Sequence, residues 1–425
     1  MVLTREFQYT PPMPSPDQSL PTSTRRRLTG ILFTASALNR TAFIAAITVT
    51  AIAAEDMLGS AQFAGVPAAV ATVGVAVGTT TISDFMAQRG RRLGFVAGLT
   101  VGVVGASLGA VAVALSSFPL LLVALYLFGM GSGADRLSRY AAADVAGPAR
   151  SASAIALIVW AGTIGSIVGP ALLGPAETVA RLVDLEAAAG VYAAAALFVG
   201  ASATLLWFFL RPDPLGAIDD IEIDDKTTSR EVRAHFRTPM GRYALLALVV
   251  GQVVMALIMA MTPIHIRGSG AGISLVGVVI SAHTLGMFAF SPVTGWLAPR
   301  VGNVRVILLG QGLLIVSALM AMPAAGDDRV LLISALFLLG LGWNLGFVAA
   351  SALLTEGIHG PAKLRVQGIG DSVTWSASAI AVFSSGVLLD WGGFARLNLI
   401  GIGIVALALI YRLSLGRLRP LATHG

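Results

Sequence analysis

Four charged residues lie inside long apolar stretches of this chain and are its first candidates for chemistry. Asp135, Arg136 and Arg139 occur together in LYLFGMGSGADRLSRYAAAD (125–144), and Arg40 lies alone in an earlier stretch. A carboxylate beside guanidinium groups can form a fixed ion pair, or it can bind and release a proton as its partners move. We expect Asp135 to pair with Arg40 and with Arg139, which follows it at a helical i,i+4 spacing. Arg136 faces about 100° away and needs another partner.

The second half of the chain holds one comparable acid. Asp371, in RVQGIGD, has Lys363 and Arg365 close by in the sequence, and either could neutralise it. For any one of these charged residues, a permanent structural ion pair is as good an interpretation as a functional one.

The composition is that of a membrane protein. Of the 425 residues, 56% are hydrophobic and only 12% are charged, with a mean hydropathy of +0.83, whereas a soluble chain has about 25% charged residues. The net charge of +6 comes from short basic clusters between apolar runs, which suits a membrane surface and not nucleic acid. There is no cysteine and no H-E-x-x-H, G-x-S-x-G or nucleotide-binding lysine motif, so we expect no enzyme activity, no cofactor and no metal site.

Twelve apolar runs are long enough to cross a bilayer as helices of roughly 20 residues. The runs are approximately 28–54, 63–87, 93–115, 119–143, 152–174, 188–210, 243–263, 273–298, 304–325, 330–355, 368–389 and 394–413. With the N-terminus inside, 23 of the 28 Lys and Arg residues fall in cytoplasmic segments, as the positive-inside rule requires. The sequence therefore predicts an all-α integral membrane protein with both termini in the cytoplasm. The excess of arginine over lysine favours a bacterial source, and hence the bacterial cytoplasmic membrane.

A charged segment divides the runs six and six. Residues 211–242 hold 13 charged residues and two early prolines, which indicates a cytoplasmic linker with a short helix over 228–237. The predicted organisation is a cytoplasmic tail, two six-helix bundles separated by the linker, and a second tail. The segments are 1–27, 28–210, 211–242, 243–413 and 414–425.

The two halves resemble each other. LFGMGSG begins at 127 and LLGLGWN at 338, so Gly129 and Gly131 match Gly340 and Gly342 at an offset of 211. AQRGRR and APRVGNVR match at an offset of 212. Two landmarks with nearly one offset indicate an internal duplication, and paired six-span repeats are an architecture of membrane transporters.

Three motifs resemble those of the major facilitator superfamily, and the resemblance covers 28–413. The loop after span 2, SDFMAQRGRR, is similar to the family's G-x-L-A-D-R-x-G-R-R, although its acid comes three residues early. Its second copy, GWLAPRVGN, has proline in place of the acid. The matching residues of these two gating loops are Asp84, Arg89, Gly90, Arg91, Arg92, Gly295, Arg300 and Gly302. On span 5, GTIGSIVGPALLGP resembles the G-x-x-x-G-P motif of proton-coupled exporters, with Gly165, Gly169 and Pro170.

The resemblance implies a secondary active transporter that works by alternating access, with spans 1, 4, 7 and 10 lining a central cavity. It implies proton-coupled efflux of small organic, amphipathic or drug-like compounds by a monomer. The proton and ion-pair candidates are then Asp135, Arg40, Arg136, Arg139 and Asp371. The candidates for contact with substrate are Asn39, Gln252, His283, Trp343, Asn344 and Trp375, although a lone histidine such as His283 more often bonds a neighbouring helix. The alternatives are an uptake carrier for an anionic metabolite or vitamin, with Arg40 on its carboxylate, and, more remotely, a transport-inactive receptor.

Overall fold

The computed structural model describes residues 20–59, 66–182, 184–215, 225–270 and 273–415, and within these ranges the chain is helical without strands. Residues 1–19 and 416–425 of the predicted tails, and 216–224 of the predicted linker, lie outside the described residues.

The first half contains six membrane crossings, two of which are interrupted or extended. Its elements are α1 (Thr22–Leu58), α2 (Val66–Arg89), α3 (Arg91–Ala114), α4 (Phe118–Arg136), α5 (Ser138–Ala146), η3 (Pro148–Arg150), α6 (Ser151–Ala171), α7 (Leu173–Arg181) and α8 (Ala187–Phe209). The predicted fourth span is α4 and α5 together, broken at Leu137. The helix α7 was not predicted; it follows the proline that lies near the end of α6.

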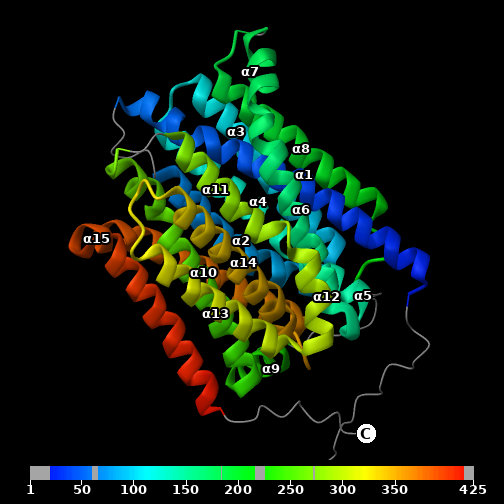
Figure 1. Cartoon of the computed structure of the whole chain (residues 1–425). Helices are drawn as coiled ribbons and strands as arrows, with labels where there is room; N and C mark the ends of the chain where they lie inside the picture. Colours follow the sequence, from blue (N-terminus) through cyan, green and yellow to red (C-terminus); the bar gives the residue numbers. More distant parts are fainter. Residues whose placement is uncertain (1–19, 60–65, 183, 216–224, 271–272, 416–425) are drawn as a thin grey trace, which may run out of the picture.

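The second half contains the short helix α9 and six further crossings. Its elements are α9 (Asp225–Arg237), α10 (Pro239–Gly268), α11 (Ile273–Phe288), α12 (Ser291–Val301), α13 (Asn303–Ala321), α14 (Arg329–Leu354) and α15 (Gly360–Ser414). Eleven helical segments of the described chain are long and apolar enough to span a membrane. The longest, α15, holds two crossings because it turns at Gly393, whose φ of 71° is not helical (Figure 1). The predicted twelve-span fold is confirmed.

The duplicated glycines have equivalent surroundings in the two halves. Gly90 and Gly302 precede α3 and α13 with φ of 89° and 91°, a conformation that favours glycine. Both turns therefore need glycine for the same reason.

The second pair of landmarks also has matching contacts. Gly129 approaches the backbone of α2 so closely that a Cβ would lie 2.1 Å from the Ala71 carbonyl oxygen. Gly340 approaches α11 in the same way, 2.2 Å from the His283 carbonyl oxygen. These contacts confirm that the sequence landmarks reflect one repeated structure.

The most extensive contacts between the two halves are those of α2 with α15 and of α6 with α12, and α6 also touches α11 and α14. One end of the molecule carries α9, the end of α12 and the start of α3, and therefore most of the arginine clusters. We name it the arginine-rich end. It is the lower end in Figure 1, where α5, α9 and α12 lie, and α7 lies at the opposite end.

Candidate functional site

The predicted pair of Arg40 and Asp135 is present in the N-terminal half. The Arg40 Nε lies 3.4 Å from the Asp135 Oδ2, and it also donates to the Ser36 Oγ at 3.1 Å. The Asp135 side chain is 6% exposed and that of Arg40 is 17% exposed. The pair therefore joins α1 to α4, inside the membrane layer, with limited access to solvent.

The predicted pairing of Asp135 with Arg139 is wrong. The helix α4 ends at Arg136, and Leu137 separates it from α5, so the i,i+4 geometry is lost between these two residues. The Arg139 Nη1 instead donates to the Arg136 carbonyl oxygen at 2.6 Å, which satisfies a carbonyl freed by the break.

Arg139 pairs with Asp371 across the two halves. Its Nη2 lies 2.5 Å from the Asp371 Oδ1, and both side chains are 1% exposed. The Tyr140 hydroxyl donates to the same carboxylate oxygen at 3.4 Å, and the Arg139 Nε donates to the Ser351 Oγ at 3.2 Å. Breaking such a buried pair by removing one partner costs about 3–5 kcal/mol, so this contact holds the halves together.

The predicted partners of Asp371 are therefore wrong. The Lys363 Nζ lies 2.7 Å from the Asp144 Oδ1, and the Arg365 Nε lies 3.2 Å from the Asp84 Oδ1. Lys363 and Arg365, the sequence neighbours of Asp371, thus pair with acids of the N-terminal half. Asp371 itself pairs with Arg139 of that half. Non-local packing of α2, α5 and α15 outweighs proximity in the sequence.

Arg136 has an aromatic partner, as its orientation required. Its guanidinium lies 3.7 Å from the ring centroid of Trp375, on α15, and 5.9 Å from that of Phe43, on α1. A cation over an aromatic face is stabilised by about 2 kcal/mol or more when it is desolvated. Trp375 therefore faces a charged group at the boundary between the halves.

The glycines of the span 5 motif allow α6 to pack closely against α1 at Arg40. A Cβ on Gly165 would lie 2.9 Å from the Arg40 Cβ, and one on Gly169 would lie 3.0 Å from the Ile44 Cγ2. Pro170 follows near the end of α6. The motif thus brings α6 against the segment of α1 that carries the central arginine.

The first gating loop forms a network at the arginine-rich end. Arg91 is fully buried, and its Nη2 donates to the Asp144 Oδ2 at 2.5 Å and to the Gln367 Oε1 at 2.8 Å. Because Lys363 also binds Asp144, one carboxylate joins α3 to α15. Together with Arg365 and Asp84, these contacts close the arginine-rich end between the halves.

Other motif residues have smaller or local roles. Arg89 is exposed, and the backbone N–H groups of Arg91 and Arg92 donate to the Asp213 carboxylate, which caps α3. Arg300 is exposed and lies over Trp296 of its own helix. Gly295 packs against α6, where its carbonyl oxygen accepts a hydrogen bond from the Ser153 hydroxyl at 2.5 Å.

Two of the predicted substrate residues bond to each other. The Trp343 Nε1 donates to the Gln252 Oε1 at 2.8 Å, and the Gln252 Nε2 donates to the Ser378 Oγ at 3.1 Å. This chain of bonds links α14, α10 and α15 within the C-terminal half. Asn39 is buried in α1, beside Arg40.

Asn344 and His283 are engaged inside the C-terminal half. Asn344 accepts from Thr294 and donates to Ser291 and to the Met287 carbonyl oxygen. His283 bonds the Leu336 carbonyl oxygen at 2.9 Å through Nδ1, which is the helix-to-helix contact expected of a lone histidine. Both side chains fasten α14 to the α11–α12 segment and do not reach the Arg136–Trp375 contact.

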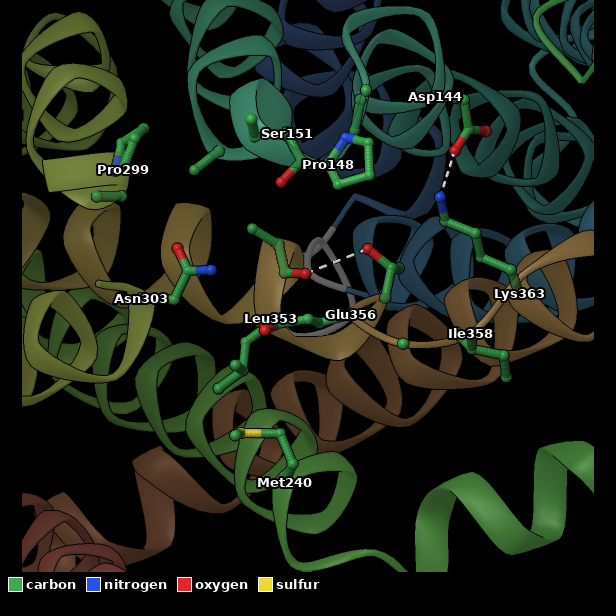
Figure 2. A pocket seen from close by; sticks show the side chains of 18 of the residues that line it. Asp144, Pro148, Ser151, Met240, Pro299, Asn303, Leu353, Glu356, Ile358 and Lys363 are labelled. Carbon is green, nitrogen blue, oxygen red and sulfur yellow. Dashed lines mark hydrogen bonds and ion pairs between the residues drawn. The ribbon is translucent and has the colours of Figure 1, made fainter. Parts of the chain in front are cut away.

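A cavity of about 1040 Å³ lies at the arginine-rich end (Figure 2). Asp144, Pro148 and Ser151 line it from the N-terminal half, and Asn303 and Lys363 line it from the other half. Its lining does not include Arg40, Asp135, Arg136 or Trp375. The cavity therefore belongs to the closed end and is separate from the central charges.

Several contributors to these networks were not predicted. They are Asp144, Gln367, Ser351, Tyr140 and Phe347, whose ring centroid lies 4.5 Å from the Arg139 guanidinium. Asp144 carried a usable signal, because it is an acid at the end of the span that faces the first gating loop. The others are ordinary polar or aromatic residues, and only packing identifies them.

These features define a membrane carrier built from two six-helix halves with paired charges between them. The family model described as Major Facilitator Superfamily matches residues 29–370 and 243–423, and the chain belongs to this family. It is 33% identical over 372 residues to the uncharacterized MFS-type transporter YdeG of Bacillus subtilis (strain 168), covering 86% of each chain. It is 30% identical over 390 residues to the riboflavin transporter RfnT of Brucella anthropi, covering 92% of this chain and 95% of RfnT. The transporter FucP, in the outward conformation, has the same fold, with a TM-score of 0.75 at 16% identity over 93% of this chain and all of FucP.

Proposed function

We propose that this chain is a proton-coupled secondary active transporter that moves small organic compounds across the bacterial cytoplasmic membrane by alternating access. The observation that supports it best is the arrangement of its two central acids. Asp135 pairs with Arg40 inside one half, whereas Asp371 pairs with Arg139 across the halves. When the halves rock apart at the arginine-rich end, the second pair must separate and the surroundings of the first must change. A carboxylate whose partners change in this way can exchange a proton once in each cycle.

Export is the first candidate direction. It is supported by the G-x-x-x-G-P motif, whose glycines pack α6 against α1 at Arg40. In export, the entry of a proton into the cell is coupled to the exit of an organic substrate.

Import of a vitamin-like substrate is the second candidate direction. The vitamin-like substrate is supported by the similarity to a riboflavin transporter over 92% of the chain, and by the contact of Arg136 with the Trp375 ring, which offers a planar cation and an aromatic face. The two candidates differ in whether proton and substrate move in opposite directions or together.

Proteoliposomes that contain the full chain test the proposal. We expect a panel of organic substrates, including riboflavin and cationic dyes, to reveal at least one whose movement against its gradient needs a pH gradient. The direction of that gradient separates export from import. If no member of the panel moves faster than in protein-free liposomes, with or without the pH gradient, the transporter proposal is contradicted and the receptor alternative gains weight.

A further inference from the structure

Two arginines of the N-terminal half form parallel contacts with α15 of the C-terminal half. Arg136 and Arg139 are three residues apart, and their partners Trp375 and Asp371 are four residues, or about one helical turn, apart on α15. The Arg139 contact ends on a carboxylate at 2.5 Å. The Arg136 contact ends on an aromatic ring at 3.7 Å, without a carboxylate. The difference that matters for binding is that Arg136 has no carboxylate of the described residues within ion-pair distance, whereas Arg139 has one.

The charges between the halves do not balance. Among the described residues of the central membrane layer, three arginines (Arg40, Arg136 and Arg139) face two aspartates (Asp135 and Asp371). A charge near the bilayer centre costs about 2.5–3.5 kcal/mol even on the lower experimental scale. The surplus positive charge is thus a standing cost, which an anion bound there would offset.

Polar atoms at this contact are also without partners. The Nε of Arg136 and the Nε1 of Trp375 are shielded from solvent and have no hydrogen-bond partner. Both side chains as wholes are only partly buried, unlike Arg139 and Asp371. A ligand oxygen beside the two nitrogens would satisfy donors that are otherwise left unpaired.

We propose that Arg136 and Trp375 form the substrate subsite for a flat aromatic monoanion, such as an aromatic carboxylate. The carboxylate would bind the Arg136 guanidinium, for which a bidentate contact is the favoured geometry. The aromatic ring would stack on Trp375 or on Phe43, whose ring centroids lie 3.7 Å and 5.9 Å from the guanidinium. This inference rests on the proposed transport function and names its substrate class.

The subsite also predicts how proton and substrate influence each other. The charged groups around Asp135 are Arg40 from α1, Arg136 on its own helix, and the Arg139–Asp371 pair across the interface. An anion on Arg136 is repelled by an ionised Asp135, so protonation of Asp135 strengthens anion binding, and the anion favours protonation in return. Ligands that favour each other travel together, which supports the import candidate over the export candidate.

The test measures binding to the full chain in lipid nanodiscs with three probes that separate charge from aromaticity. The probes are 2-naphthoate, its neutral amide 2-naphthamide, and the aliphatic anion cyclohexanecarboxylate. We expect 2-naphthoate to bind about tenfold tighter or more than each of the others, because a charge-assisted bond and a stacked ring each add to affinity. We also expect its binding to tighten when the pH is lowered.

Variants assign the preferences to residues. Arg136→Gln should remove the preference for naphthoate over the amide, and Trp375→Leu should remove the preference for naphthoate over the aliphatic anion. Arg136→Lys, which keeps the charge but not the planar group, should retain the preference for the anion even if Arg136→Gln fails to fold. Arg396→Gln is the matched control, because Arg396 lies over Trp391 in a similar contact on the exposed outer face of α15.

The proposal is overturned if naphthoate and its amide bind equally, or if folded Arg136→Gln keeps the preference of the parent protein. Transport that depends on a pH gradient, measured separately, decides the proposed function. If substrates are transported without any preference for anions, the subsite proposal is refuted and the transporter proposal is not. If the parent protein binds the anion as expected but transports no substrate, the transporter proposal is refuted and the subsite proposal is not.

Discussion

At the scale of single residues, the three central arginines have only two aspartates between them, and the two ion pairs differ in how tightly they are held. Arg139 is fixed by Asp371, Tyr140 and Ser351, all of them buried. Arg40 is partly exposed, and its contact with Asp135 is longer, at 3.4 Å. The pair in the N-terminal half can thus separate at lower cost than the pair between the halves, which makes Asp135 the better candidate for the proton site.

Asp135→Asn should abolish transport driven by a pH gradient while leaving exchange of substrate down its own gradient, because asparagine resembles a permanently protonated aspartate. Neutralising Arg40 should impair both modes, since an unpaired carboxylate would remain in the membrane layer. The two modes are compared in proteoliposomes, with the exposed acid replacement Asp390→Asn as the control. If the Asp135→Asn variant still transports substrate against its gradient and the Asp371→Asn variant does not, the proton site lies in the second half.

The sequence predicted the residues of this cluster better than their pairing. Arg40 and Asp135 were found because both lie deep in apolar runs, where a charge needs a partner. The Arg139–Asp371 pair was not predicted, because a regular helix through Leu137 would direct Arg139 toward Asp135. Only the break between α4 and α5 directs it across the interface. Such a break has no reliable local signal in a stretch without proline.

At the scale of elements, hydropathy predicted the helices and small residues set how closely they pack. The twelve predicted runs correspond to the observed crossings, because a backbone in lipid must satisfy its own hydrogen bonds. The helix α7 and the turn at Gly393 escaped prediction, since both follow from local backbone geometry at the edge of an apolar run.

Gly169→Val should lower transport while the protein still inserts in the membrane. The added Cβ would lie 3.0 Å from the Ile44 Cγ2 and 3.2 Å from the Thr41 carbonyl oxygen, so α6 must move away from the segment of α1 that carries Arg40. Overpacking of this kind costs about 1–3 kcal/mol. Initial transport rates per inserted molecule are the measurement. Gly312→Val on α13, where a Cβ meets nothing within 4 Å, is the control; full activity in Gly169→Val would remove the structural basis of the span 5 argument.

Docking of α9 should weaken as the pH falls. His235 is buried, and its Nε2 bonds the Leu354 carbonyl oxygen at 2.9 Å; burial lowers its pKa below the ordinary value. The undocked histidine therefore binds protons more readily, so docking is strongest above about pH 6.5 and is lost as the pH falls toward the lowered pKa.

Hydrogen exchange of the α9 amides, corrected for the intrinsic pH dependence, measures this effect between about pH 7 and pH 5. His235→Gln, which can still donate to the Leu354 carbonyl oxygen, should abolish the pH dependence. His359→Gln, at an exposed histidine, should preserve it. Protection of α9 that stays constant with pH in the parent protein would refute the role of His235.

At the scale of the whole molecule, the charge pattern predicts its orientation. The arginine-rich end should face the cytoplasm, because basic residues are retained there during insertion. A reporter fused after Arg242 should therefore be cytoplasmic, and one fused at Asp328 should be external. Activity of a reporter that functions only in the cytoplasm, compared with one that functions only outside, measures the two positions. Reporters that indicate the same side for both fusions would contradict the orientation and the count of spans between them.

The structure is closed at the arginine-rich end, where α15 packs tightly against α2 at Gly368. A Cβ on Gly368 would lie 2.6 Å from the Ser83 Cβ and 2.8 Å from the Thr79 carbonyl oxygen, both on α2. Gly368→Val should therefore separate α15 from α2 and shift the population toward a state that is open at this end. The same end is closed by the Asp144–Lys363 pair and by the bond from Ser153 to the Gly295 carbonyl oxygen.

The absence of native cysteine allows this shift to be measured directly. Ser153→Cys places one thiol at the closed interface with little change in shape. It weakens the bond to the Gly295 carbonyl oxygen equally in every background, so the labelling rate by a maleimide compares how often that interface opens in each variant. We expect Gly368→Val to raise the rate several-fold, by about tenfold for a shift of about 1.4 kcal/mol. Gly403→Val, on the exposed face of the same helix where a Cβ meets nothing within 4 Å, should leave the rate unchanged. Equal labelling in both backgrounds would mean that the packing of Gly368 against α2 does not hold this end closed, and that the latch lies in the other contacts between the halves, such as the Asp144 network.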